Sequence, residues 1–308
     1  MPHPHEGRCE VTAQPLVVVV GSVNRDTTWT VERFPLPGET LVGSSMSHRL
    51  GGKGANQAVA VARAGSSVTL VATVGTDPAG EALVRELAEF GVTTDLVFAM
   101  EGTTGSALIV VDGAGQNQIV VLAGTNAHTG RVRLEAVSDS LRAAQVVVVQ
   151  GEVPAASVDF LSVLLQDCAA LFLLNLAPVI PVARGTFNRV DVLIVNESEA
   201  SELLGIRGLD GDESANLLTE WAPVVLLTLG PSGAILARLG LPTLYIPAPP
   251  AEVVIDTTGA GDAFVGVLAA GLARGNDIAV AARDAVAAAT QTVSRPGAAS
   301  SYPLFQLT

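Results

Sequence analysis

LVVVVG, residues 16–21, is the first of several short runs of Val, Leu and Ile in this chain. Comparable runs are VTLVATVG from Val68, AQVVVVQG from Ala144, LFLLN from Leu171, VLIVN from Val192 and VVLLTLG from Val224. Unbroken apolar strands of this length are buried on both faces, which is typical of a parallel sheet rather than of an antiparallel sheet with one face in water.

Helical patterns lie between these runs. In residues 79–90, Leu83, Leu87 and Phe90 fall on one face, and Gly91 stands where a C-cap is expected. The alternation of strands and helices predicts a doubly wound α/β fold.

Two segments, 27–50 and 105–122, break this alternation. The second has the pattern of a hairpin, with SALIVV and NQIVVL on either side of DGAGQ. Both predict a small β lid over the main sheet. Because the sequence has no internal repeat and no low-complexity linker, we expect residues 16–308 to form one large domain that includes this lid.

The composition limits the classes of function. The 308 residues are 49% hydrophobic and 4% aromatic, which is enough for a sizeable core built from Ala, Val and Leu. With 17 Lys and Arg against 30 Asp and Glu, the net charge is -13, and the sequence contains no basic patch. Since such a chain repels polyanions, nucleic acids and anionic membranes are not expected partners.

The cysteines and the first residues indicate a cytoplasmic protein. Two cysteines cannot form a disulfide framework, which favours a reducing compartment. The leader, residues 1–15, lacks the basic start and apolar core of an export signal, and we expect it to be disordered. The longest apolar stretch, LFLLNLAPVI, is too short to cross a bilayer.

Polar residues directly follow the apolar runs. In a doubly wound sheet, ligands bind beyond the carboxyl ends of the strands, so these residues are expected to meet in one cleft. They are Asn24, Asp26, Glu152, Asn196, Glu199, Thr228 and Asp262.

DTTGAGD, residues 256–262, predicts chemistry at one end of this cleft. The following DAFVGVLAAGLARG has a helical pattern that ends near Gly275, so the N–H groups of residues 259–262 would lie free at a helix N-terminus. Such a terminus attracts phosphate. An aspartate beside it, Asp262, suits a general base that accepts a proton from the attacking hydroxyl. Taken alone, the heptapeptide is equally compatible with Asp262 as a helix cap and the glycines as a turn.

GGKGANQA, residues 51–58, is the second marked feature. Its adjacent glycines let the backbone approach a ligand, and Asn56 is expected to begin a helix that runs to about Ala64, or merely to cap it. The sole lysine, Lys53, lies here, so the chain has no G-x-x-x-x-G-K-[ST] phosphate loop. GSVN after the first run is not the dinucleotide-binding glycine pattern either, which disfavours a nicotinamide-dependent oxidoreductase.

With these two motifs in this order, the sequence resembles the ribokinase branch of the PfkB carbohydrate-kinase family over nearly the whole chain after the leader. PGET, VGTDPAGE, NLAP, VNESEA, TLGPSG and RPGAA agree with the same family. The resemblance implies a ribokinase-like fold, a three-layer, mostly parallel α/β sheet with a β lid. It also implies an enzyme that transfers phosphate from ATP to the 5-hydroxyl of D-ribose.

The resemblance also implies roles for individual residues. Asp262 would be the base, and the N–H groups of Gly259, Ala260 and Gly261 would form the anion hole. The residues that hold the sugar hydroxyls would be Asn24, Asp26, Gly52, Lys53, Asn56 and Glu152. Those near ATP and its Mg²⁺ would be Asn196, Glu199, Thr228, Gly230, Gly233 and Val286.

A monovalent cation, K⁺, and a second subunit are implied in the same way. The cation ligands would be Asp256, Thr258, Thr292, Arg295, Gly297 and Ser301. The lids of two subunits would pair into a homodimer.

Several alternatives remain open at this stage. The substrate could be 2-deoxyribose, fructose or a nucleoside such as adenosine, although GGKGANQA favours ribose. The chain could also be a catalytically silent sugar-binding protein, but such a protein would lack the base, and Asp262 is present. Glu152 could be a helix-start carboxylate before Pro154, and Glu199 could be a surface residue.

Overall fold

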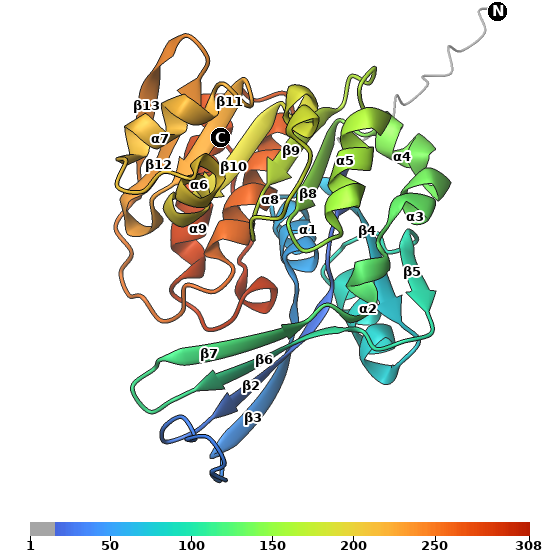
Figure 1. Cartoon of the computed structure of the whole chain (residues 1–308), viewed down its shortest axis with the longest axis vertical. Helices are drawn as coiled ribbons and strands as arrows, with labels where there is room; N and C mark the ends of the chain where they lie inside the picture. The colour runs from blue at the N-terminus through green and yellow to red at the C-terminus, as the bar shows by residue number, and fades with distance from the viewer. Residues whose placement is uncertain (1–15) are drawn as a thin grey trace, which may run out of the picture.

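The main body of the protein is a three-layer α/β sandwich (Figure 1). Its structure, a computed structural model, describes residues 16–308, so the leader at residues 1–15 lies outside the described residues. A nine-stranded sheet in the order β13-β12-β11-β10-β9-β8-β1-β4-β5 forms the middle layer. The predicted doubly wound α/β fold is therefore confirmed.

The strands of this sheet coincide with the apolar runs. They are β1 (Leu16–Val20), β4 (Ser67–Gly75), β5 (Val97–Met100), β8 (Val146–Gln150), β9 (Leu171–Asn175), β10 (Val192–Asn196), β11 (Val224–Thr228), β12 (Gly233–Arg238) and β13 (Leu241–Pro247). All neighbours from β5 to β11 pair in parallel, whereas β11, β12 and β13 pair antiparallel. Because helices cover both faces, the parallel strands need apolar side chains on both sides.

The helices divide between the two faces. One face carries α1 (Lys53–Arg63), α2 (Pro78–Glu89), α8 (Ala260–Ala273) and α9 (Ile278–Thr292). The other carries α3 (Arg131–Ala136), α4 (Ser138–Ala143), α5 (Ala155–Leu164), α6 (Glu197–Leu204) and α7 (Gly211–Leu218). Each set packs over its own hydrophobic cluster. No helix in the described part of the chain is long and apolar enough to cross a membrane.

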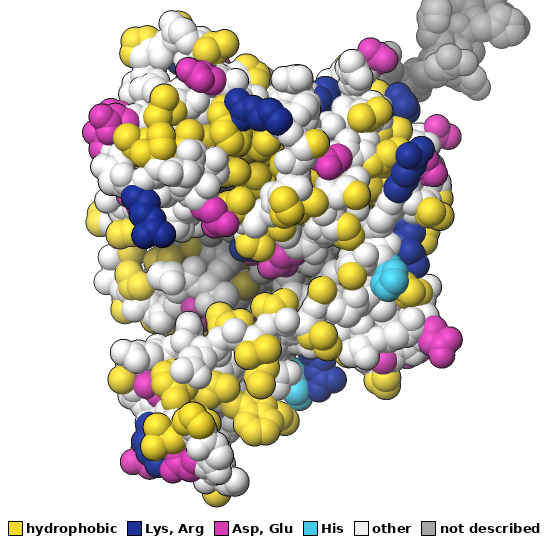
Figure 2. Space-filling view, in the orientation of Figure 1, with side chains coloured by type: hydrophobic (Ala, Val, Ile, Leu, Met, Phe, Trp, Pro, Cys, Tyr) yellow, Lys and Arg dark blue, Asp and Glu magenta, His cyan; other side chains and the backbone are white. Residues whose placement is uncertain are grey.

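A second sheet of four strands projects from the body (Figure 1). It consists of β2 (Asn24–Thr30), β3 (Ser45–Gly51), β6 (Gly105–Val111) and β7 (Asn117–Leu122), in the order β3-β2-β6-β7. β6 and β7 form the antiparallel hairpin expected from the sequence. β2 and β6 pair in parallel, so this sheet, called the lid below, is mixed. Figure 2 shows a recess between lid and body.

Two helices begin earlier than the sequence suggested. α1 starts at Lys53 rather than at Asn56, which lies inside the helix and is 6% exposed, so its predicted role as helix start or cap is wrong. α8 starts at Ala260. In both cases a glycine with positive φ, Gly52 at 88° or Gly259 at 78°, forms the N-cap. Glycine adopts this conformation without steric cost, so at both positions the chain turns directly into the helix.

Candidate active site

Asp262 lies buried in the first turn of α8, and both of its carboxylate oxygens accept hydrogen bonds from side-chain amides. Asn56 Nδ2 donates to Oδ2 over 2.9 Å, and Gln57 Nε2 donates to Oδ1 over 3.0 Å. Burial raises the pKa of Asp262, while the charge of Lys53 and these two hydrogen bonds act in the opposite direction. The amides thus favour the ionised carboxylate that a general base requires.

Gln57 is a site residue that sequence reasoning missed. Its Oε1 accepts a hydrogen bond from Gln150 Nε2 over 2.7 Å, so its own Nε2 must face Asp262 and Asn175 Oδ1, the latter at 3.0 Å. Asn175 Nδ2 in turn donates to the carbonyl of Ile194 over 3.1 Å. The chain of amides fixes the orientation of Gln57, and nothing local in the sequence marks it beyond its place in GGKGANQA.

Glu152 links β1 to the start of α1. Its Oε2 accepts hydrogen bonds from Ser22 Oγ and from the backbone N–H of Lys53, the latter over 2.9 Å. The interpretation of Glu152 as a carboxylate that only starts the next helix is therefore insufficient, because both partners lie about a hundred residues earlier in the chain.

Asp26 is half-buried, and one of its two carboxylate oxygens is enclosed without a partner. Its Oδ1 has no hydrogen-bond partner, and burial, then the charges of Glu152 and Asp262, raise the pKa of Asp26 to about 7. Asn56 Oδ1 is another buried oxygen without a partner. Unsatisfied buried acceptors are costly and uncommon, and hydroxyl groups of a ligand would satisfy them.

Asn24, at the start of β2, is held through its side-chain oxygen. Its Oδ1 accepts a hydrogen bond from Asn126 Nδ2 over 2.7 Å, and Asn126 is itself held by the N–H of Val23 at 3.0 Å. The oxygen of Asn24 is thus engaged, and its NH₂ group points elsewhere. Asn126 is a second residue that sequence reasoning missed, because its partners lie more than a hundred residues away.

A cavity of about 120 Å³ joins the Asp262 end of the site to the carboxyl ends of β10 and β11. It is lined by Lys53, Asn175, Ala177, Ile194, Val195, Asn196, Glu199, Thr228, Gly259, Gly261, Asp262 and Val265. Among residues 16–308, no carboxylate lies within ion-pair distance of the Lys53 ammonium. The charge of Asp262, more than any other influence, raises the pKa of Lys53 and keeps it protonated.

The predicted anion hole is only partly free. The N–H of Ala260 is directed at the carbonyl of Thr257, with 3.3 Å between nitrogen and oxygen. Gly259 and Gly261 both line the cavity. At a helix start, the following N–H groups have no intrahelical acceptor, so the first turn of α8 still presents donors to the cavity.

The end of the cavity predicted to hold the nucleotide contains a helix cap that involves two of the predicted residues. Asn196 Oδ1 accepts from the N–H of Glu199 over 2.9 Å, and Glu199 Oε2 accepts from the N–H of Asn196 over 2.8 Å, which is a capping box at α6. Burial raises the pKa of Glu199. Thr228 lies at the end of β11 and lines the cavity, whereas three other predicted residues do not line it. Gly230 begins the 3-10 turn after β11, Gly233 is the first residue of β12, and Val286 is a buried residue of α9, 4% exposed.

The residues predicted to hold a monovalent cation come from two adjacent loops. Asp256 Oδ1 accepts from the N–H of Thr258 over 2.9 Å, and Oδ2 accepts from the N–H of Gly297 over 2.8 Å. Burial opposes ionisation of Asp256, but these hydrogen bonds and the charge of Arg49 outweigh it, so its pKa is lowered. The Ser301 hydroxyl donates to the carbonyl of Gly297 over 2.8 Å.

Two further predicted cation ligands, Thr292 and Arg295, flank the same loop, where the N–H of Arg295 donates to the carbonyl of Thr292 over 3.2 Å. Backbone carbonyls and one carboxylate are hard oxygen donors, so the loop fits a weakly hydrated cation. In the described part of the chain, no group of three or more His, Cys, Asp or Glu side chains could hold a metal ion.

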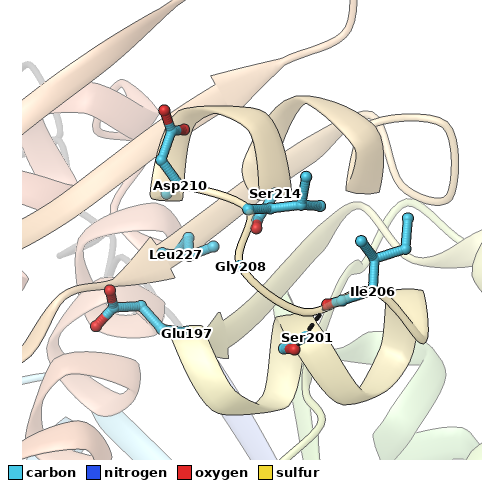
Figure 3. A pocket seen from close by; sticks show the side chains of 9 residues that line it. Glu197, Ser201, Ile206, Gly208, Asp210, Ser214 and Leu227 are labelled. Carbon is cyan, nitrogen blue, oxygen red and sulfur yellow. Dashed lines mark hydrogen bonds between the residues drawn. The ribbon is translucent and has the colours of Figure 1, made fainter.

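A second hollow, of about 30 Å³, lies between α6 and α7 (Figure 3). It is lined by Glu197, Ser201, Ile206, Gly208, Leu209, Asp210, Gly211, Ser214 and Leu227. Ser201 Oγ donates to the carbonyl of Ile206 across its rim over 2.7 Å (Figure 3). The hollow has room for about one water molecule and shares no residue with the larger cavity, so we place no substrate there.

The fold and this polar cavity define the class of the protein. Residues 14–304 match the model of the pfkB family of carbohydrate kinases, and the chain belongs to that family. It is a phosphotransferase with an alcohol group as acceptor, as the sequence motifs predicted.

Within this family, the chain is similar to several ribokinases. The chain is 35% identical over 288 residues to a ribokinase of Bacillus subtilis, an alignment that covers 93% of this chain and 96% of the relative. It is 31% identical over 297 residues to the ribokinase of Haemophilus influenzae, with 95% and 96% covered. The solved structure of Arabidopsis thaliana ribokinase complexed with ribose and ATP is 30% identical, with a TM-score of 0.88 over 94% of this chain and 96% of that one.

Proposed function

We propose that the protein transfers the γ-phosphoryl group of ATP to the 5-hydroxyl of D-ribose. The main structural support is the buried carboxylate of Asp262, which two amides hold at a helix N-terminus in the same cavity as Lys53. The similarity to ribokinases, one of them solved with ribose and ATP, supports this choice of substrates.

Asp262 acts as the general base in this proposal. As the sugar oxygen attacks the γ-phosphorus, the hydroxyl proton passes to the carboxylate, and the bond between γ-phosphorus and the oxygen bridging to the β-phosphate breaks to give ADP. Lys53 and the N–H groups at the start of α8 stabilise the negative charge on the transferred group. Asp262 then releases its proton to solvent.

The sugar is held by the groups that lack partners in the protein. These are Asp26 and Asn56, whose unpaired Oδ1 atoms accept hydrogen bonds from its hydroxyls. Two residues that already have protein partners add to them: Glu152 accepts another hydroxyl, and Asn24 donates through its NH₂ group. The backbone at Gly52 and Lys53 approaches the sugar, because glycine leaves no side chain in the way. Binding therefore satisfies oxygens that are costly to bury empty.

In this proposal the nucleotide lies along the other half of the cavity, over Asn196, Glu199 and Thr228. It extends past the cavity lining toward Gly230, Gly233 and Val286. Mg²⁺ fits beside Asn196 and Glu199 through its own water shell, since both side chains keep their capping contacts. When bound, it would neutralise charge on the phosphates.

K⁺ fits the loops that carry Asp256, Thr258, Thr292, Arg295, Gly297 and Ser301. The contact between Asp256 and the N–H of Gly297 supports this assignment, because it brings the two loops together. When bound, the cation would order the loop that leads into the anion hole.

A homodimer that forms through the lid completes the proposal. The lid carries exposed apolar side chains, among them Trp29 at 47%, Met46 at 59% and Val120 at 67% exposed, which a second copy would cover (Figure 2). We also propose that the protein works in the cytoplasm, where ATP is available and where the free thiol of Cys168 is stable.

The test is an ADP-release assay with D-ribose, 2-deoxyribose, fructose and adenosine, for wild type and Asp262→Asn, with and without K⁺. We expect ribose to give the highest kcat/KM, and Asp262→Asn to lower kcat by about 10² to 10⁴-fold. The absence of sugar-dependent ADP release would refute the kinase function. Preference for another acceptor would overturn only the substrate, and an active Asp262→Asn would overturn only the base.

A further inference from the structure

Tyr302 contacts the backbone at the start of the helix that carries the proposed base. Its hydroxyl donates a hydrogen bond to the carbonyl oxygen of Gly259, with 2.6 Å between the two oxygens. Tyr302 is 3% exposed, and its ring packs 6.0 Å from that of Phe305. Gly259 is the N-cap of α8, three residues before Asp262. The phenol is thus buried directly beneath the first turn of the helix.

The carbonyl of Gly259 has two donors. Besides the Tyr302 hydroxyl, it accepts the N–H of Ala263 over 2.8 Å, which is the first hydrogen bond of the helix. Because a peptide unit is planar, two donors on its oxygen fix the orientation of the whole Gly259–Ala260 unit. A Cβ on Gly259 would lie 2.6 Å from the Tyr302 hydroxyl and 2.6 Å from Ala298 Cβ, so the packing leaves no room for adjustment there.

Tyr302 also connects this helix start to the neighbouring loop. It directly follows Ser301, whose hydroxyl donates to the carbonyls of Gly297 and Ala298 over 2.8 and 2.7 Å. The N–H of Gly297 binds Asp256, at the beginning of the DTTGAGD segment. The segment is therefore held at Asp256 by one end of the loop and at Gly259 by the other.

We propose that Tyr302 is a positioning residue for phosphoryl transfer. Its hydroxyl holds the start of α8, so that the N–H groups of the first turn and the carboxylate of Asp262 keep their relative places as charge develops. The inference rests on the proposed function of the Asp262 site. An interaction that matters mainly in the transition state affects kcat more than KM.

The experiment compares Tyr302→Phe with wild type and with Tyr245→Phe. Phenylalanine keeps the ring and removes only the hydroxyl. Tyr245, the other of the two tyrosines, also donates to a backbone carbonyl, that of Ser232 at 2.6 Å, but it is 53% exposed on β13. It is therefore a control for the loss of one phenol–carbonyl hydrogen bond elsewhere in the protein.

For Tyr302→Phe we expect kcat to fall about five- to tenfold, which corresponds to the loss of one hydrogen bond, with the sugar KM unchanged within about twofold. Amide hydrogen exchange over residues 259–263 should become faster. In Tyr245→Phe, this exchange should match wild type, and any kinetic change should fall on the KM for ATP rather than on kcat, because Ser232 stands between Gly230 and Gly233. Thermal unfolding of both variants should be measured to check that each is folded at the assay temperature.

Three results would overturn the inference: wild-type kcat in Tyr302→Phe, an equal loss of kcat in Tyr245→Phe, or unchanged exchange over residues 259–263. The exchange measurement does not depend on substrate. If wild type itself released no ADP with any sugar, the proposed function would fail, and the exchange data alone would still show whether the hydroxyl holds the helix start.

Discussion

Gln57 Nε2 donates a hydrogen bond to Asp262 Oδ1 over 3.0 Å, although the two residues are 205 positions apart in the chain. The bond joins the second turn of α1 to the first turn of α8, two helices that pack against each other on one face of the sheet. The two sequence motifs thus meet in a single buried contact. The proposed base and the amide that orients it thus come from distant parts of the chain.

Replacing Gln57 should change the pH dependence of the reaction. Its hydrogen bond lowers the pKa of Asp262, so Gln57→Met should raise that pKa. Because the proposed base must be ionised, the acid limb of the kcat profile is expected to move to higher pH. The measurement is kcat between pH 5 and 9 at saturating substrates. Gln166→Met, in the exposed turn after α5, is the control. An unmoved acid limb in Gln57→Met would contradict the assignment.

Asp26→Asn should make the protein more stable and less active. The pKa of Asp26 in the folded protein, about 7, lies above its ordinary value of 3.8, so the folded state binds this proton more tightly than the unfolded state does. This contribution to stability is complete below pH 3.8 and is lost as the pH rises through 7. Asparagine has no proton to lose, so the gain in unfolding free energy should be larger at pH 8 than at pH 4.5, on the order of 2 to 4 kcal/mol at most.

Urea unfolding at the two pH values measures this difference, with Asp167→Asn as an exposed control. The sugar KM of Asp26→Asn should rise, because a carboxylate acceptor is replaced by an amide. If the variant were less stable than wild type at pH 8, the raised pKa assigned to Asp26 would be wrong.

Lys53→Met should impair ATP use more than sugar binding. The ammonium lies in the cavity without an ion-pair partner among residues 16–308, and Lys53 is the one basic residue among those that line the cavity. We expect kcat/KM for ATP to fall by about 10² to 10³-fold. Its loss also removes a charge that lowers the pKa of Asp262, so the remaining activity should need higher pH. Unchanged ATP kinetics would remove Lys53 from the phosphate site.

Val120→Glu should separate the proposed dimer into monomers. Val120 lies on β7 of the lid and is 67% exposed, so a charge there opposes burial against a second copy. Sedimentation velocity measures the change. Val163→Glu is a matched control, because Val163 is also 67% exposed but lies on α5 of the body. A wild type that sediments as a monomer would refute the dimer.

The sequence predicted the main sheet well because its signal is local. Each buried parallel strand needs apolar residues on both faces, so runs such as Val17 to Val20 are visible without any tertiary information. Helix starts were less predictable. Asn56 has the side chain of a cap, but the positive φ of Gly52 starts the helix earlier, and that conformation depends on packing against Ser22 and Asn24.

The hydrogen bonds among the side-chain amides of the site could not be predicted from the sequence, for a different reason. In the sequence, Gln57 is an ordinary polar residue of a helix. Only the fold brings Gln150 to its amide oxygen and Asp262 to its amide nitrogen. By contrast, the pairing of Asn196 with Glu199 follows from the local spacing of a capping box. Contacts within one turn can be read from the sequence, whereas contacts between distant strands and helices require the fold.

The solitary lysine gives the protein an unusual chemical simplicity. Among its 308 residues, only Lys53 has an ε-amino group, and that group lies in the cavity beside Asp262. An amine-directed reagent therefore has one side chain to modify besides the N-terminal amine. Mass spectrometry separates a label on Lys53 from a label on the N-terminal amine, so lysine modification reports on this cavity, and protection by a bound nucleotide can be measured at one site.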